Sequence, residues 1–267
     1  MVLIFALGGL VGNGVVLKVY WKSVKQNSQT SQLYIVLLAC IDLYSCLVYL
    51  PQIPFQEWGL VPQIVVISQA TLQTLAYLFV QVAMIVDRVF AVFQPHQFNQ
   101  MRRRTNIALT TLFVIAQLTI QTSVFVSIFF VENMLGTPVF VTLFALGLIV
   151  MLVAYPAITI KLYRQNRRIH QAPATATNPL IAVQQQKNQQ HMKIIRMYLA
   201  VLALFLVSFL PVVGLALGAD KTAPWLGYFY HLNNVGNPVI YYAFSDKFRE
   251  EVKVILSRVT LRNVCCR

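Results

Sequence analysis

The sequence predicts an all-α membrane protein, in which a bundle of seven transmembrane helices is followed by a short amphipathic eighth helix on the inner leaflet. Of its 267 residues, 58% are hydrophobic and only 11% are charged, whereas charged residues make up about a quarter of a soluble domain. Apolar stretches long enough to cross a bilayer recur between short polar loops. Every lysine and arginine except Lys221 falls on one side of an alternating topology, and the positive-inside rule makes that side cytoplasmic.

The excess of basic residues also suggests a nucleic-acid binder, an interpretation that their distribution excludes. The net charge is +13, but the charges flank apolar spans instead of gathering on one soluble face. We therefore expect membrane lipid as a partner and no nucleic acid, in a multi-pass plasma-membrane protein with a cytoplasmic C-terminus. The sequence contains no Ser/His/Asp set, metal-ligand cluster or phosphate-binding loop, so we expect no enzymatic function.

The first two spans each carry a polar residue that lipid would not tolerate. Residues 1–17 contain Asn13, and an amide at that depth should face another helix. Residues 33–50 contain Asp42, the only acid expected near the middle of the membrane. An ionised carboxylate there costs about 3 kcal/mol or more unless it is paired or hydrated. Asp42 therefore indicates either a functional polar cluster or a protonated carboxyl that is hydrogen-bonded within the bundle.

The third span, residues 62–93, is the longest and contains many glutamines and threonines, so we expect it to be central. At its inner end Asp87 and Arg88 are adjacent, and such a pair can hold its two charges neutral at the edge of the low-dielectric region. Taken alone, the pair is typical of an interfacial salt bridge as well as of a switch. The fourth span, residues 106–130, follows a run of arginines.

A low-complexity segment separates the fifth and sixth spans. The fifth span, residues 138–163, contains Tyr155 followed by a proline and ends near several arginines. Residues 171–190 consist mainly of Ala, Thr, Pro, Asn and Gln, which predicts a cytoplasmic loop that cannot pack a core.

Prolines interrupt the last two spans. In the sixth span, residues 192–217, Phe205 and Phe209 precede Pro211 at a spacing of four residues, which usually reflects packing. In the seventh span Pro238 removes a backbone hydrogen bond, so we expect a kink. This span also carries more hydrogen-bonding amides than a lipid-facing helix tolerates, so it should face the inside of the bundle. These amides are Asn233, Asn234 and Asn237.

The chain changes character after the seventh span. Residues 245–257 alternate apolar and charged faces at helical spacing, which predicts an amphipathic helix on the inner leaflet. We accordingly divide the chain into a transmembrane domain, residues 1–244, and an amphipathic helix with a tail, residues 245–267. Cys265 and Cys266 in that tail are either palmitoylated, as a second anchor, or unmodified thiols.

Short motifs occur in order in five of the seven spans and cover nearly the whole chain. They are Gly12-Asn13, Leu38-Ala39-Cys40-Ile41-Asp42, Asp87-Arg88-Val89, Phe205 through Phe209-Leu210-Pro211, and Asn237-Pro238-Val239-Ile240-Tyr241 with Phe248 beyond. Together with the number and order of the spans, they resemble the rhodopsin-like (class A) G-protein-coupled receptors. Within that family the chain is most similar to neuropeptide receptors or to receptors without a known ligand.

The resemblance implies a mechanism. An allosteric sodium ion would bind in a polar cavity formed by Asp42, Asn13, Asn233 and Asn237. Asp87 would hold Arg88 at rest and release it when the sixth helix swings outward about Pro211. The residues that implement this switch would be Asp87, Arg88, Tyr155, Phe205, Phe209, Pro211, Asn237, Pro238 and Tyr241. The opened inner face would then receive the α-subunit of a heterotrimeric G protein. The resemblance implies no other cofactor.

Departures from the family pattern bear on sodium and on the ligand. Gln63 replaces the cysteine of the usual outer disulfide. Tyr77 replaces a small hydroxyl residue beside the sodium, which puts sodium binding in doubt. Ala70 and His231 replace the aspartate of amine receptors and the lysine of opsins, so both ligand classes are disfavoured. The remaining pocket candidates suit a peptide or a neutral hydrophobic ligand. The full set is Tyr49, Gln52, Ile67, Ala70, Thr71, Thr74, Phe209, Val213, Gly227 and His231.

Two other functions compete with a signalling receptor. A degenerate, receptor-like membrane protein that no longer signals would explain the short first span and the missing disulfide. An ion or solute transporter could line a path with Asp42 and the amides, but transporters commonly contain internal repeats. The two halves of this sequence show no repeat.

Overall fold

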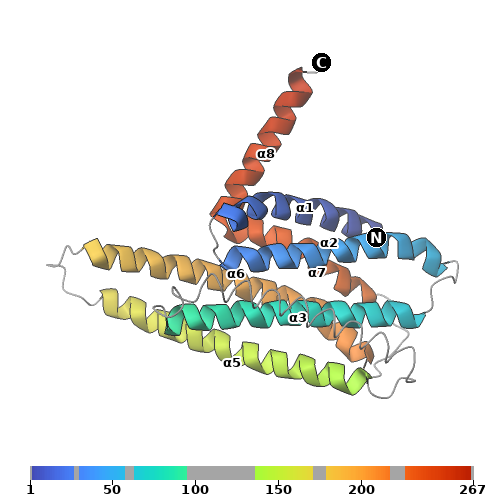
Figure 1. Ribbon diagram of the computed structural model, residues 1–267, viewed down its shortest axis with the longest axis horizontal. Coiled ribbons are helices and arrows are strands. Elements are labelled where there is room, and N and C mark those ends of the chain that lie inside the picture. Colours follow the sequence, from blue (N-terminus) through green and yellow to red (C-terminus); the bar gives the residue numbers. More distant parts are fainter. Residues whose placement is uncertain are drawn as a thin grey trace.

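The computed structural model describes residues 2–26, 30–57, 63–94, 136–170, 179–216 and 226–265. These residues form seven α-helices and no strand (Figure 1). The helices are α1 (Val2–Gln26), α2 (Thr30–Glu57), α3 (Gln63–Phe93), α5 (Gly136–His170), α6 (Pro179–Ala216), α7 (Leu226–Phe244) and α8 (Asp246–Cys265). The predicted fourth span, residues 106–130, lies outside the described residues.

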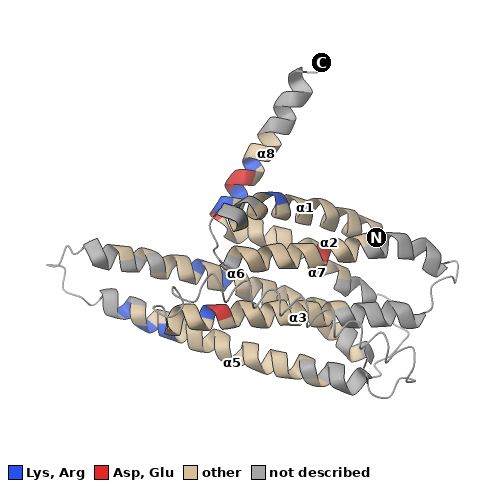
Figure 2. Cartoon of the chain, in the orientation of Figure 1, with Lys and Arg blue, Asp and Glu red and all other residues tan. Residues whose placement is uncertain are grey.

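The long helices run side by side as a bundle, and α8 turns away from it (Figure 1). The neighbours in the bundle are α1 with α2 and α7, α6 with α7 and α5, and α3 with α2 and α5. We call the end of the bundle at which α8 begins the α8 end. Lysines and arginines gather toward the α8 end (Figure 2).

Within the part of the chain that the structure describes, four helices contain segments that are long and apolar enough to cross a membrane. A shorter apolar segment, Gln32–Leu47, lies in α2. The four segments are Leu3–Trp21, Gln73–Phe93, Phe144–Gln165 and Asn188–Pro211. Large apolar side chains cover the outward faces of these helices, among them Ile4, Leu152 and Val153, which are more than half exposed. These findings confirm the helical, membrane-type part of the predicted fold.

Most of the described helices are longer than the spans predicted from the sequence; α1, for example, continues to Gln26 and α2 to Glu57. Helix α6 begins at Pro179, so it includes much of the segment, residues 171–190, that we expected to be a loop. Proline suits the first helical position, and the Ala, Leu and Gln residues that follow have high helix propensity, although they lack the apolar periodicity of a core helix. Helix α8 extends to Cys265, beyond the predicted end of the amphipathic segment.

Close packing between helices depends on glycine at specific positions. A Cβ atom at Gly12 of α1 would lie 2.9 Å from Cγ of Pro238 in α7. A Cβ atom at Gly147 of α5 would lie 2.6 Å from Cδ1 of Leu78 in α3. Because real Cβ atoms do not approach other atoms so closely, both contacts hold two helices nearer than any other residue would allow.

Candidate functional site

The most polar part of the bundle interior surrounds Asp42 on α2. Asp42 is fully buried, and both of its carboxylate oxygens accept hydrogen bonds. The hydroxyl of Tyr77 on α3 donates to Oδ1, and Nδ2 of Asn237 on α7 donates to Oδ2 over 2.9 Å. Three helices therefore meet at this carboxylate, and each donor offsets part of the cost of burying it.

Asn13 joins the same interior region from α1. Its Nδ2 donates to the backbone oxygen of Asn234 over 2.7 Å and to that of Gly9 over 2.9 Å. The first bond links α1 to α7, and the carbonyl that accepts it lies one turn before Pro238, the residue that cannot donate a backbone hydrogen bond. Asn13 therefore faces another helix, as the sequence predicts, and contacts backbone atoms of α7.

Asn233 takes a different position from the other predicted members of the cluster. Its side chain is buried, and its Nδ2 has no hydrogen-bond partner in the described part of the chain. The amide of Asn234 contacts the cluster instead, because its Oδ1 lies 3.4 Å from the Tyr77 hydroxyl. The structure thus brings Asn237 directly to Asp42, Asn13 to the adjoining turn of α7, and Asn233 to neither.

The geometry around Asp42 also tests whether the residues suit a sodium ion. The Tyr77 hydroxyl is in direct contact with Oδ1, so no ion can lie between these two atoms. The tyrosine ring is itself buried and fills the space beside the carboxylate. Buried oxygens of Asn13 and Asn237 have no partner among the described residues, but without access to Oδ1 they do not complete an ion site. The residues present therefore do not fit sodium.

Tyr77 also contacts an aromatic cluster that extends to α6 and α5. Its ring centroid lies 5.5 Å from that of Phe209 and 6.4 Å from that of Phe205. Phe205 and Phe209 are 4.7 Å apart, and Phe144 of α5 lies 5.9 Å from Phe205. The predicted pair on α6, one to two turns before Pro211, is thus connected through one side chain to the carboxylate on α2.

A buried ion pair lies nearer the α8 end. Nη2 of Arg88 is 2.7 Å from Oδ2 of Asp87, and the two side chains are 7% and 4% exposed. The guanidinium also lies 5.8 Å from the ring centroid of Tyr198 on α6. A buried pair of this kind is stable only while both partners stay in place, because either charge alone would be costly in the interior.

The two predicted tyrosines of the switch are both buried. The hydroxyls of Tyr155 on α5 and Tyr241 on α7 have no hydrogen-bond partner in the part of the chain that the structure describes. The Tyr241 ring packs edge-on against Tyr20 and Phe248, at centroid distances of 6.4 Å in both cases. Neither tyrosine hydroxyl bonds to Arg88.

Helix α8 is attached to the bundle by its first turns. The rings of Tyr20 and Phe248 stack at 5.9 Å, and the hydroxyls of Tyr20 and Ser245 share a hydrogen bond of 2.8 Å. Lys193 at the beginning of the apolar part of α6 donates to Oδ2 of Asp246 over 2.9 Å. This hydrogen bond and the Lys193 charge lower the pKa of Asp246 below its usual range.

Most of the predicted ligand pocket falls outside the described side chains. Of that set, the side chains of Thr74, Phe209 and His231 are described, and all three are buried. The side chains of the two predicted lipidation sites are also outside the described residues. The predicted residues without a described side chain are Tyr49, Gln52, Ile67, Ala70, Thr71, Val213, Gly227, Cys265 and Cys266.

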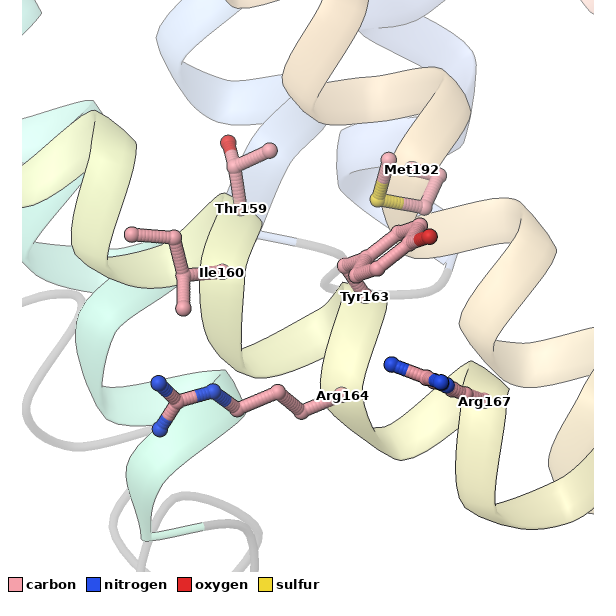
Figure 3. Close-up of a pocket in the computed structure, with 6 residues that line it drawn as sticks. All are labelled: Thr159, Ile160, Tyr163, Arg164, Arg167 and Met192. Carbon is pink, nitrogen blue, oxygen red and sulfur yellow. The ribbon is translucent and has the colours of Figure 1, made fainter.

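An open groove occurs elsewhere, between α5 and α6 at the α8 end (Figure 3). Its volume is about 410 Å³, and its lining combines apolar side chains with two arginines of α5. The lining residues are Thr159, Ile160, Tyr163, Arg164, Arg167 and Met192. None of them belongs to the predicted ligand pocket.

Sequence reasoning did not identify two of the residues that organise this site. Tyr77 was singled out only as a departure from a family pattern, and Tyr198 was not singled out at all. A tyrosine within an apolar span is a usable signal, because its hydroxyl must find a partner and its ring must pack. No protein-family model matches the chain, and no curated protein is significantly similar to it.

Proposed function

We propose that this chain is a seven-helix receptor of the plasma membrane that couples an extracellular ligand to a heterotrimeric G protein. The ligand is a peptide or a neutral hydrophobic molecule, the G protein binds at the α8 end, and that end faces the cytoplasm. The concentration of basic residues at the α8 end supports this orientation (Figure 2).

One observation carries the proposal: Arg88 is buried at the α8 end beneath a residue of α6. Tyr198 lies over the guanidinium, and Asp87 neutralises it from the same helix. A partner at this end can reach Arg88 only if α6 moves away from α3. A helix that closes over a paired charge is a two-state element, and a protein that binds only the open state stabilises that state.

The part of α6 that lies away from the α8 end provides the connection to a ligand. Phe205 and Phe209 of α6 pack against Tyr77, which is hydrogen-bonded to Asp42. A ligand that displaces this aromatic cluster therefore changes the position of α6 without contacting Arg88. Pro211 lies inside α6 just beyond the cluster and provides a point at which the helix can bend.

The experiment is a measurement of nucleotide exchange on a panel of Gα subunits, in membranes that contain the chain, with and without a library of ligands. We expect exchange that requires Arg88 and is lost in Arg88→Ala. The matched control is Lys18→Ala, which removes an exposed basic residue of α1. Surface expression is measured for all three proteins.

Exchange that persists in Arg88→Ala would refute the role of Arg88. If the wild-type protein stimulates nucleotide exchange on no Gα subunit of the panel, although its surface expression is normal, G-protein coupling would be refuted. That result would leave the degenerate, non-signalling receptor as the better interpretation, and ion flux would then test the transporter.

A further inference from the structure

The hydrogen bond between Tyr77 and Asp42 also bears on cation binding, which the proposed function does not address. In this bond a neutral side chain from α3 occupies one oxygen of a fully buried carboxylate. The other oxygen accepts from Asn237, so both sides of the carboxylate are bonded to protein groups. The donors belong to α3 and α7 and the acceptor to α2, so the bonds hold three helices together.

The position of the tyrosine ring makes this arrangement rigid. Tyr77 is only 1% exposed, and its ring is held by Phe205 and Phe209 of α6. Its hydroxyl also lies 3.4 Å from Oδ1 of Asn234. Because the ring is packed on one side and the hydroxyl bonded on the other, the phenol cannot leave Oδ1 unless α6 or α3 moves.

We propose that the Tyr77 hydroxyl is a built-in substitute for a cation at Asp42. The carboxylate is satisfied by a donor that is covalently part of the chain, so its state does not depend on the sodium concentration. Because the Tyr77 ring also packs against α6, the hydrogen bond to Asp42 is coupled to the position of α6. A free ion would have no such contact with α6. This coupling to α6 rests on the proposed function, whereas the exclusion of sodium does not.

The surrounding oxygens show what the tyrosine prevents. The amide oxygens of Asn13 and Asn237 and the hydroxyl of Ser45 are buried and lack hydrogen-bond partners among the described residues. Ser45 lies three residues after Asp42 on the same helix, and Asn237 already contacts the carboxylate. Carboxylate, amide and hydroxyl oxygens are the ligands that hard cations prefer. Removal of the phenol therefore leaves a polar space that can accept an ion together with water.

The test is the thermal unfolding temperature of the purified chain in sodium chloride and in choline chloride at equal concentration. This comparison keeps ionic strength and chloride constant, and it needs neither a ligand nor a G protein. We expect the wild-type protein to unfold at the same temperature in both salts. In Tyr77→Ser, which removes the ring and keeps a small hydroxyl, we expect a higher unfolding temperature in sodium than in choline. The double variant Tyr77→Ser with Asp42→Asn should lose that difference.

Each result decides one part of the proposal. A sodium-specific stabilisation of the wild-type protein that Asp42→Asn removes would overturn it, because sodium would then bind despite the phenol. A folded Tyr77→Ser variant that is indifferent to sodium would overturn the claim that the tyrosine is what excludes the ion. If Tyr77→Ser does not fold, Tyr77→Thr, which also removes the ring and keeps a small hydroxyl, is compared in the same two salts. A folded Tyr77→Thr variant without a sodium response would overturn the proposal.

Failure of the proposed function has a different signature. If the chain activates no G protein, the salt comparison is unaffected, because it reports only on ion binding. If the chain does activate one, Tyr77→Phe should raise basal nucleotide exchange relative to wild type at any sodium concentration. Unchanged basal exchange in that variant would show that the Tyr77 hydroxyl does not influence the movement of α6.

Discussion

Replacement of Asp87 by asparagine should increase basal signalling. The carboxylate and the Arg88 guanidinium are 2.7 Å apart in an interior position, and a hydrogen bond between charged groups contributes about 1.5 to 3 kcal/mol. Asparagine still accepts a hydrogen bond from the guanidinium, but it carries no negative charge, so the buried charge of Arg88 is no longer neutralised. The closed state should therefore lose about 1 to 2 kcal/mol relative to an open state in which Arg88 reaches water. A change of that size shifts the equilibrium by about 5-fold to 30-fold.

The assay is basal nucleotide exchange on the responsive Gα subunit, normalised to the amount of protein at the cell surface. The control is Glu250→Gln, which breaks an exposed pair with Lys253 at 3.0 Å in α8. Exposed pairs of this kind contribute at most about 1 kcal/mol, so we expect no comparable rise. Basal exchange that is unchanged or reduced in Asp87→Asn, with normal surface expression, would refute the view that this pair holds α6 closed.

Two further predictions concern packing and attachment in the bundle. Because Lys193 lowers the pKa of Asp246, this carboxylate stabilises the folded state above its ordinary pKa and loses that effect only as the pH falls through the lowered value. The unfolding temperature should therefore not change through this pair between about pH 7 and pH 5, and added salt should weaken the attachment instead. The contact with Pro238 means that Gly12→Ala should lower the unfolding temperature, whereas Gly14→Ala, which meets no atom within 4 Å, should not. Equal effects of the two glycine variants would contradict the close contact between α1 and α7.

The parts of the fold that follow from local composition could be predicted from the sequence. Apolar length predicted helices of membrane-spanning type, and α3 occupies almost the same residues as the predicted third span. The beginning of α6 could not be predicted from apolar content, because residues from Pro179 onward are mainly polar and still form a helix. Helix propensity acts there without a hydrophobic face, and composition alone does not separate such a helix from a loop.

Only part of the candidate site could be predicted from the sequence. Asp42 and Asn237, expected to share one polar cavity, are hydrogen-bonded to each other, because both are polar groups that must avoid the lipid. Asn233 does not join them, and the contact of Tyr77 with Asp42 was not predicted. Which group satisfies the second carboxylate oxygen depends on the rotation of α3, and the tyrosine hydroxyl reaches it only because its ring fits between helices. Contacts across helices of this kind depend on side-chain shape in three dimensions, which sequence periodicity does not contain.

The contact between Tyr20 and α8 has a consequence for the way this protein is made. The two residues that share the 2.8 Å hydrogen bond are separated by 225 positions in the chain. At a synthesis rate of about 5 to 20 residues per second, about 10 to 45 s pass between the addition of Tyr20 and the addition of Ser245. During that interval Tyr20 has no aromatic neighbour from the C-terminal region, and the first helix must remain in the membrane without it. A chain that ends before residue 245 therefore still contains α2 and α7, the main neighbours of α1, but lacks the hydrogen bond and the ring stacking that attach α8 to Tyr20.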